Sequence, residues 1–542
     1  MSQTAAANSP RHAVLPAARQ AVPSARRRFI ARYPGLGALT TYSAAVYIGQ
    51  ALVIIRGGLL APLLAPAAFG LWRLLKLGLD YAQYLPFGTL HALRQEVPTA
   101  LGRRDPARAR QIVRVIFGTL LLICAITLTA AWAGCWVAVR WRPDVASRGL
   151  LVVPFLITAS LLLQFADAKF VSEERPATSG GMALVFALLS LIAMPWGAHV
   201  AGLAGALAGL LLSQLTVLAW LAIRGTFPVP VWPRWRTLQP LWRIGWPIWV
   251  TWIPLTVLGD VDQWLVGAWL GPAKMGYYGI VIFLGSLLMF LPFIFRSTYQ
   301  PFLTRASAGS SDPADLRRSI ERSLYLIGYA APLPIAALYF ASTPLVEAWL
   351  PAYREVLPAA RWYCLGTFWW MVASVTGMMC VVAGRKRRWF AQTLLAIAGH
   401  VALTTAVIRA GGGLTGVALC TATVFTLYAA AQVHAVLRIV EAGWRNWAAV
   451  LGRLLVPFGT LTGLCLGLSR VWPLSASEWT ATLGPALAGT AVACSTLALL
   501  FAAANRRLAF TELLRHRIGS VQLPPAAADA STAVPEGTDA FD

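Results

Sequence analysis

Charged residues are scarce in this sequence. They make up 12% of the 542 residues, while 58% of the residues are hydrophobic. The mean hydropathy is +0.64. A soluble protein carries about 25% charged residues, so a chain of this length with half that share is typical of a polytopic membrane protein.

Catalytic and cofactor-binding motifs are absent from the sequence. It contains no GxxxxGK[ST] loop to hold nucleotide phosphates, which excludes an ATP-driven pump built from this chain alone. It also contains no HExxH or GxSxG arrangement. Its seven cysteines form no CxxC pair and lie mostly in apolar runs, so we interpret them as packing residues. The sequence therefore predicts neither an enzyme nor a cofactor or metal site.

Long apolar runs are what the sequence does contain. A membrane-spanning helix needs about 20 predominantly apolar residues. Fourteen runs meet this requirement and predict an all-α protein: 37–64, 67–90, 112–138, 149–171, 176–197, 199–222, 244–268, 275–297, 323–343, 357–383, 389–408, 412–437, 447–469 and 480–504.

The basic residues are distributed unevenly between the predicted loops. The formal charge is +24. If the N-terminus is cytoplasmic and basic residues near the ends of spans are counted with the adjoining loop, 34 of the 45 Lys and Arg residues lie on the inside, 8 on the outside and 3 within spans. This bias follows the positive-inside rule and predicts that both termini are cytoplasmic. The basicity therefore reflects topology, and we do not expect nucleic acid as a partner.

An internal repeat divides the apolar part of the chain into two halves. Pro66 and Gly70 align with Pro272 and Gly276 at a separation of 206 residues. Because each repeat holds six spans, an even number, the two copies enter the membrane from the same side as parallel repeats. Further aligned segments are Leu85–Phe87 with Leu291–Phe293 and, after one inserted residue, Asp105–Ala107 with Asp312–Ala314.

The repeat predicts the domain organisation. Two lobes of six spans each are followed by two additional spans, and this core lies between two tails. The predicted boundaries are 1–36 for a disordered basic cytoplasmic tail, 37–225 for the N-lobe, 226–243 for a cytoplasmic linker, 244–440 for the C-lobe, 441–505 for spans 13 and 14, and 506–542 for a cytoplasmic tail. Two-lobed bundles of this kind commonly transport by rocking one lobe against the other around a central cavity.

Charged residues interrupt the second predicted span. Arg73, Lys76, Asp80 and Tyr84 lie on or beside one helical face. A charge that faces lipid costs about 2.5–3.5 kcal/mol, so this face is expected to point inward. One interpretation is that Lys76 and Asp80, four residues apart, form an internal ion pair that fixes packing. The other is that the face lines a cavity that meets the substrate.

Arg56 of the first span corresponds in the repeat to Asp262 of the seventh. Equivalent positions lie at the same depth and face the symmetry axis alike, so we expect both residues to face the cavity, with a cation opposite an anion. The alternative is an ion pair between Arg56 and Asp262 that closes one end of the cavity. Asp260 lies about 200° around the helix from Asp262 and is expected to meet a different neighbour.

Two further groups of residues carry weaker signals. Asp167 and Lys169 lie near the inner end of the fourth span and are interpreted as residues that extend to the membrane interface. Trp246, Trp249 and Trp252 are interpreted as part of an interfacial aromatic belt, although aromatic faces also stack on sugars.

The pattern of spans and turns resembles a known family. Two six-span repeats plus two spans, a Pro/Gly turn after spans 1 and 7, and LGPxxxGYY at Leu270–Tyr278 are similar to the polysaccharide and O-antigen flippases. These belong to the multidrug/oligosaccharidyl-lipid/polysaccharide exporter superfamily. The resemblance covers about residues 37–440. Arg56 and Arg73 match the cationic residues typical of the first two spans, whereas Asp80, Asp260 and Asp262 depart from that pattern.

The resemblance implies a function and a location. Such proteins flip undecaprenyl-diphosphate-linked sugars from the inner to the outer face of the bacterial cytoplasmic membrane. The implied partners are the lipid-linked oligosaccharide, membrane lipids, and the polymerase and glycosyltransferases of the same pathway. The implied cavity residues are Arg56, Arg73, Lys76, Asp80, Tyr84, Asp260 and Asp262.

Two other functions remain open from the sequence. A cation-coupled multidrug antiporter of the same superfamily would need acidic residues in its first span, but residues 37–64 contain one Arg and no Asp or Glu. A membrane-embedded polysaccharide polymerase or ligase would need catalytic groups in sizeable outer loops. The longest predicted outer loops, near 139–148 and 344–356, are short.

The charge bias makes a prediction about topology. A reporter fused after Arg388 is expected to be cytoplasmic, and one fused near Arg354 is expected to be external, because these positions lie in loops of opposite predicted sides. Activity of paired alkaline phosphatase and fluorescent-protein fusions measures the side directly. A reversed result at either position would contradict the predicted spans.

Overall fold

The computed structural model describes residues 34–141, 151–289, 291–292, 295, 313–382, 386–440, 443–472 and 479–508. Within these ranges the chain is helical and contains no strand, which confirms the predicted all-α class. Most of both predicted tails, Arg385 of the basic turn, and Phe293 and Asp312 of the second repeat lie outside the described residues.

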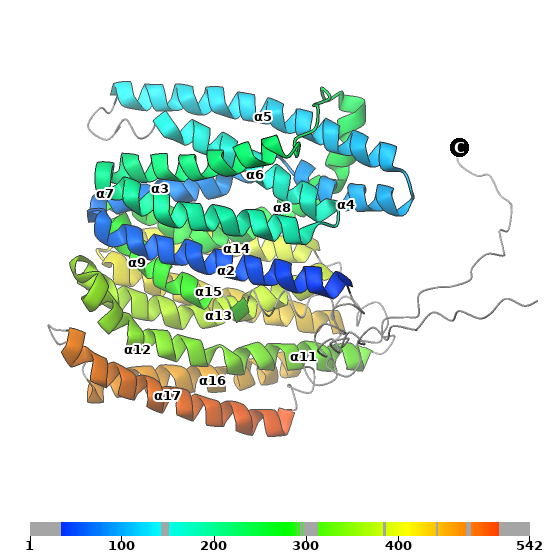
Figure 1. Ribbon diagram of the computed structural model, residues 1–542. Coiled ribbons are helices and arrows are strands. Elements are labelled where there is room, and N and C mark those ends of the chain that lie inside the picture. The colour runs from blue at the N-terminus through cyan, green and yellow to red at the C-terminus, as the bar shows by residue number, and fades with distance from the viewer. Residues whose placement is uncertain are drawn as a thin grey trace, which may run out of the picture.

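The helices follow one another with short connections (Figure 1). The first repeat contains α2 (Pro34–Leu63), α3 (Pro66–Ala82), α4 (Thr89–Gly102), α5 (Pro106–Trp141), α6 (Val153–Ser172) and α7 (Pro176–Ile223). The second contains α8 (Trp235–Leu265) with a π-helical turn (Val266–Leu270), α9 (Gly271–Leu288), α11 (Pro313–Ala330), α12 (Pro332–Trp349), a 3₁₀ turn (Pro351–Val356), α13 (Leu357–Val382), α14 (Lys386–Arg409) and α15 (Gly413–Leu437). After a 3₁₀ turn (Arg438–Val440) come α16 (Trp444–Val471) and α17 (Trp479–Leu508).

Ten continuous helical segments of the described chain are long and apolar enough to cross a membrane. Two of them hold two predicted spans each. The segment Pro176–Ile223 is broken by non-helical angles at Ala201 and Gly202, and the segment Trp235–Leu288 contains both α8 and α9. The chain is thus a multi-pass membrane protein. A helix occupies each of the fourteen predicted runs, but fourteen crossings stay a prediction.

Two of the helices differ in extent from the predicted spans. The second span was expected to run to residue 90, but α3 ends at Ala82 and the helix resumes as α4 at Thr89. Pro86 lies in this break, where Phe87 and Gly88 adopt φ values of 47° and 86°, which a helix does not accommodate. The ninth span was expected to begin at residue 323, but α11 begins at Pro313 because its polar first turns extend the apolar helix.

The helices form two groups that match the repeats. Helices α2 to α7, apart from α3, pack mainly on one another, through contacts such as those of α2 with α7 and of α4 with α5, whereas α3 packs mainly on α9. Helices α8 to α15 do the same, through contacts of α13 with α15 and of α14 with α8. We call these groups the N-lobe and the C-lobe. Helices α16 and α17 lie beyond the C-lobe at one edge of the molecule, where α17 packs on α12, and α5 lies at the opposite edge (Figure 1).

The two lobes meet where α3 crosses α9, at the end of the bundle that the topology predicts to be outside. A Cβ atom on Gly70 would lie 1.8 Å from the carbonyl oxygen of Pro272, and one on Gly276 would lie 1.8 Å from that of Pro66. These glycines and prolines are the four aligned residues of the repeat. Only glycine permits backbones to approach so closely, so the repeat motif forms a symmetric contact between the lobes.

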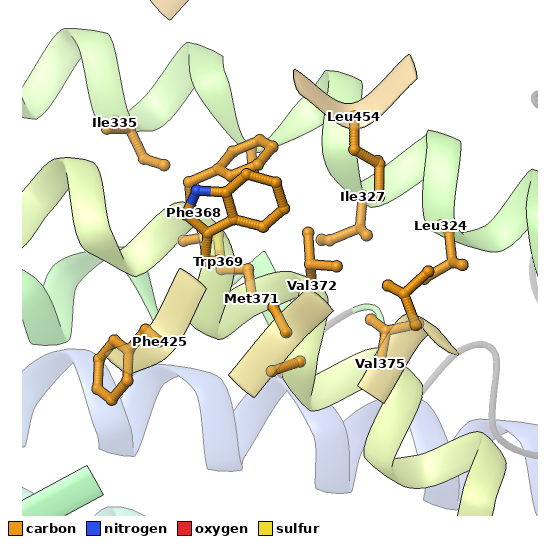
Figure 2. Packing of buried hydrophobic residues seen from close by; sticks show 14 of the residues in the cluster. Leu324, Ile327, Ile335, Phe368, Trp369, Met371, Val372, Val375, Phe425 and Leu454 are labelled. Atoms are coloured by element: carbon orange, nitrogen blue, oxygen red, sulfur yellow. The ribbon is translucent and has the colours of Figure 1, made fainter. Parts of the chain in front are cut away.

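Buried apolar clusters support each lobe and the junction between them. The C-lobe cluster includes Phe368 and Trp369 on α13 and Leu454 on α16, which joins the last two helices to the lobe (Figure 2). A second cluster spans both lobes near the α3–α9 crossing. There the Tyr353 hydroxyl lies 3.2 Å from the carbonyl oxygens of both Ala61 and Leu64 at the end of α2.

The lobes also meet at the predicted inner end. A Cβ atom on Gly245 would lie 1.9 Å from the carbonyl oxygen of Gly88, which brings the start of α4 against α8. The Trp249 indole Nε1 donates to the Tyr84 carbonyl at 2.7 Å. The Tyr84 hydroxyl shares a hydrogen bond of 2.6 Å with Thr256. The break between α3 and α4 is therefore held against α8 by side-chain hydrogen bonds.

The glycine contact makes a prediction about the outer end. Gly70→Val is expected to separate the lobes there, because overpacking of a close contact costs about 1–3 kcal/mol. Spin labels on Ala67→Cys and Ala273→Cys, which are exposed counterparts in the repeat, should then move apart. The matched control is Gly78→Val on the same helix, where a Cβ atom would meet nothing within 4 Å. An unchanged distance in Gly70→Val would show that this contact does not hold the lobes together.

Candidate substrate cavity

A cavity of about 410 Å³ lies between α2, α3 and α9, at the junction of the lobes. Three cationic side chains, Arg56, Arg73 and Lys76, line it. A buried cation is stable only if it has hydrogen-bond partners or a counter-charge. The hydrogen-bond partners of each cation therefore show how many of its donors are left for a ligand.

Arg56 is anchored within the N-lobe. Its side chain projects from α2 and only 5% of the residue is exposed. Its Nη1 donates to the Ser190 hydroxyl on α7 at 2.7 Å. Its Nε is buried and has no hydrogen-bond partner among the described residues. The guanidinium is thus positioned by one bond and retains unused donors.

Arg73 crosses from one lobe to the other. It projects from α3, and its Nη2 donates to the Gln263 Oε1 on α8 at 2.7 Å. Its Nε also has no hydrogen-bond partner among the described residues. The aliphatic part of the side chain lies over Gly279 on α9, where a Cβ atom would come within 2.7 Å of Arg73 Cγ. Gly279 is the counterpart of Arg73 in the repeat, so the symmetric position is left empty to accommodate the arginine.

Lys76 and Asp80 form an ion pair of 2.5 Å along α3, with side-chain exposures of 30% and 46%. The ion pair proposed in the first interpretation therefore exists. Lys76 also lines the cavity, so the pair does not remove it from the site. An intrahelical pair of this exposure contributes little stability, and a ligand anion can compete with Asp80 for the ammonium group.

A second cavity, of about 240 Å³, lies on the C-lobe side of α9 between α8, α13 and α15. Asp260 and Gln263 line it, and the Gln263 Nε2 donates to Asp260 Oδ1 at 2.9 Å. Ser286 and Met289 line both cavities, so the two are neighbours. Arg73, Gln263 and Asp260 form a continuous chain of hydrogen bonds from the first cavity to the second.

Asp262 lies in a different place from the one predicted. It is completely buried inside the C-lobe, where its Oδ2 accepts from the Tyr278 hydroxyl at 2.7 Å and the Thr421 hydroxyl at 3.1 Å. The alternative of an ion pair between Arg56 and Asp262 is therefore wrong, and so is the expectation that Asp262 faces the cavity, because each residue bonds to helices of its own lobe. His400 extends the cluster, with its Nε2 3.3 Å from the Thr421 hydroxyl. The repeat predicted equivalent positions correctly but could not predict which neighbour each side chain selects.

Uncharged residues of the site were missed by sequence reasoning. Ser190 and Gln263 hold the two arginines, and Ser286 lies between the cavities. Ser286 is the counterpart of Asp80 in the repeat, so mapping charged positions across the repeat would have identified it. No signal in the sequence marks Ser190 or Gln263, since neutral polar residues are common in membrane helices.

The family of the chain is established by comparison with known sequences. A family profile described as "Polysaccharide biosynthesis protein" matches residues 59–352, more than half of the chain. The chain belongs to this family. Comparison with curated proteins finds no significant match.

Solved structures with the same fold belong to the multidrug/oligosaccharidyl-lipid/polysaccharide (MOP) superfamily. An inward-facing multidrug resistance MATE family transporter has a TM-score of 0.62 at 14% identity, covering 77% of this chain and 99% of its own. The lipid II flippase MurJ in an inward closed conformation has a TM-score of 0.59 at 13% identity, covering 86% and 99%. A MOP transporter from Pyrococcus furiosus has a TM-score of 0.51 at 14% identity, covering 75% and 96%. The resemblance predicted from the sequence is thus confirmed for family and fold.

A third cavity of this polysaccharide biosynthesis protein, of about 540 Å³, lies at the predicted inner end and is lined by residues such as Tyr84 and Trp249. Trp249 stacks on Trp246 with ring centroids 4.7 Å apart, and Trp246 lies 4.9 Å from Trp242. At least Trp249 therefore lies at the lobe junction instead of a lipid-facing aromatic belt. The side chain of Trp252 lies outside the described residues.

Ionisable side chains also line the third cavity. The Arg94 Nη2 lies 2.5 Å from Asp167 Oδ2, and the Ser179 hydroxyl donates to Asp167 Oδ1. Asp167 therefore pairs with protein groups, and its position at the membrane interface stays a prediction. Lys169 instead donates to the Thr226 carbonyl at 2.5 Å. Burial, with a smaller effect of the Arg94 charge, lowers the pKa of His91 and keeps this ring neutral at pH 7.

The contacts of Asp262 make a prediction about stability. Asp262→Ala is expected to cost about 1–3 kcal/mol, because it leaves the buried Tyr278 hydroxyl without its acceptor. Combined with Arg56→Ala, the losses should add to within about 0.5 kcal/mol, since the two residues share no partner. Unfolding of the purified variants in detergent measures both. The control pair, Asp262→Ala with Thr421→Val, should be non-additive, and coupling between Arg56 and Asp262 would contradict the separate networks.

Proposed function

We propose that this protein flips a lipid-linked oligosaccharide, joined to undecaprenyl through a diphosphate, from the cytoplasmic to the outer face of the bacterial inner membrane. The observation that carries the proposal is the cavity lined by Arg56, Arg73 and Lys76 at the lobe junction of a polysaccharide biosynthesis protein. The proposed location of the protein in the inner membrane, with both termini cytoplasmic, rests on the charge bias of the loops and on the family resemblance.

The chemistry of the cavity fits a diphosphate. A diphosphate with attached sugars cannot cross about 30 Å of hydrocarbon unaided, because each charge and hydroxyl would lose its water. Arginine offers planar paired donors that match phosphate oxygens and stays charged at any physiological pH. The Nε atoms of Arg56 and Arg73 lack protein acceptors among the described residues. A phosphate oxygen would supply the acceptors that these groups lack.

The lobe contacts fit alternating access. The lobes touch at Gly70 and Gly276 near the predicted outer end and at Gly88 and Gly245 near the inner end. At both places the backbones approach closely, and at the outer one a buried apolar cluster shared by the two lobes surrounds the contact. A rocking motion that opens one contact at a time would carry the headgroup across while the lipid tail stays between the lobes.

A cation-coupled multidrug antiporter is the second candidate function. Asp260, which lines the second cavity, gives this candidate its support, because a carboxylate in a membrane cavity attracts cations. The cavity that holds Arg56, Arg73 and Lys76 opposes it, because three cations repel a cationic drug. A polymerase or ligase has less support: the outer segment Pro351–Val356 is a short 3₁₀ turn with Tyr353 and Val356 buried.

Arg73 provides the test of the proposed function. Arg73→Ala should largely abolish export, with lipid-linked oligosaccharide accumulating on the cytoplasmic side, because the diphosphate loses its paired donors. Arg73→Lys should remain inserted and export partly, since a point charge replaces the planar fork. Surface polysaccharide and the amount of protein in the membrane are measured in the same cells. Arg409→Ala, which removes an exposed cation near Trp269, is the matched control and should export normally.

The packing interpretation predicts the opposite result. If Arg73 only joins the lobes through Gln263, then Arg73→Ala lowers the amount of inserted protein and leaves export per molecule normal. That outcome would remove Arg73 from the site and contradict the proposed function. Resistance to cationic drugs that depends on Asp260 would favour the antiporter instead.

A further inference from the structure

We infer that the second cavity is a subsite for the sugar ring next to the diphosphate. The inference rests on the proposed function and extends it by giving the two neighbouring cavities different parts of the headgroup. The first cavity would hold the charged diphosphate and the second the first sugar. The residues that line the second cavity, their spacing and its size carry the argument.

The second cavity has an aromatic wall. Trp370 on α13 and Phe425 on α15 both line it, with ring centroids 4.6 Å apart. Phe425 is buried beneath, whereas Trp370 is only half-buried and so presents ring surface to the cavity. A sugar ring has one face covered by C–H groups, which carry small positive charges and pack well on the negative face of an aromatic ring.

The second cavity also has a polar edge. Asp260 receives one hydrogen bond from Gln263, and a carboxylate has about four acceptor positions. Sugar hydroxyl groups are donors that can fill those positions. Thr367 lines the same cavity, and its hydroxyl donates to the Cys364 carbonyl at 2.6 Å, so its oxygen remains an acceptor. An aromatic face with acceptors at its edge matches an uncharged polyhydroxyl ring better than a phosphate, which Asp260 would repel.

The size and position of the cavity fit one ring. Its volume of about 240 Å³ is below the ~300–1,000 Å³ of pockets for drug-sized ligands, so it suits a single sugar and not a chain. Ser286 and Met289 line both this cavity and the cationic cavity, so the two are neighbours. A sugar in this position would be directly bonded to a phosphate held by Arg73, and Gln263 would link the two sites.

The test compares lipids with and without a sugar. The full-length protein in nanodiscs is titrated with undecaprenyl diphosphate and with the same lipid carrying one glucose, galactose or N-acetylglucosamine. Binding is followed by native mass spectrometry. At least one sugar-bearing lipid should bind about tenfold more tightly than the bare lipid, as expected for one stacking contact with accompanying hydrogen bonds.

Variants assign the preference to the cavity. Trp370→Ala should reduce the affinity for the sugar-bearing lipid to that for the bare lipid, and Trp370→Phe should retain most of the preference. Asp260→Asn preserves the size of the side chain and tests the site if Trp370→Ala does not fold. It should also lower the preference for the sugar-bearing lipid and should leave the affinity for the bare lipid unchanged. Trp196→Ala is the control, because Trp196 lies on α7 and is 68% exposed. It should change neither affinity.

The outcomes separate the inference from the proposed function. Equal binding of all four lipids by the wild type, or a preference that survives both Trp370→Ala and Asp260→Asn, would overturn the sugar subsite while the flippase proposal stands. Failure of the wild type to bind any diphosphate lipid would overturn the proposed function itself. Arg73→Ala should lower the affinity for the bare lipid and for the sugar-bearing lipids to the same extent.

Discussion

The close approach of α3 and α9 is the contact on which the rest of the structure depends. Gly70 and Gly276 allow the two backbones to touch, and the prolines before them start both helices at the same level. This crossing joins the lobes, closes the predicted outer end and places the side chains of α3 next to α9. Because the backbones touch and buried apolar side chains of both helices, such as Phe69 and Tyr278, pack around them, this crossing fixes how the two lobes meet.

The repeat gives this crossing its symmetry, and function requires that the symmetry be broken. Arg73 lies over its own counterpart, Gly279, since two large side chains could not share the axis. Asp80 has Ser286 as its counterpart, which removes a charge from the C-lobe side of the crossing. The result is a cationic cavity on one side of α9 and an aromatic, acidic cavity on the other. A ligand with a charged end and an uncharged polar end matches such a pair of cavities.

The cations of the cavity are held loosely by comparison with the buried groups of the C-lobe. Arg56 and Arg73 each make one side-chain hydrogen bond and have a buried Nε without a partner in the described part of the chain. Asp262, in contrast, accepts from the backbone N–H of Gln263 and from the hydroxyls of Tyr278 and Thr421. Groups with unused hydrogen-bond donors can bind and release a ligand, whereas a group whose hydrogen bonds are all made within the protein stabilises the lobe. The same contrast separates the aligned residues Arg56 and Asp262, of which Arg56 lines the cavity and Asp262 is buried inside the C-lobe.

The sequence by itself determined that this is a helical membrane protein with an internal repeat and with charged residues in α2, α3 and α8. These features follow from hydropathy and spacing, which are local properties of the chain. It also determined the family. Only the tertiary structure decided that Asp262 points into the C-lobe, that Gln263 and Ser190 position the arginines, and that Trp370 and Asp260 line the same cavity. A helical position has several possible neighbours, and the one it meets depends on the rotation and crossing of helices distant in the chain. The sequence marks the break in the second span by Pro86, but only the tertiary structure shows that Gly88 in this break contacts Gly245, a residue 157 positions away in the sequence.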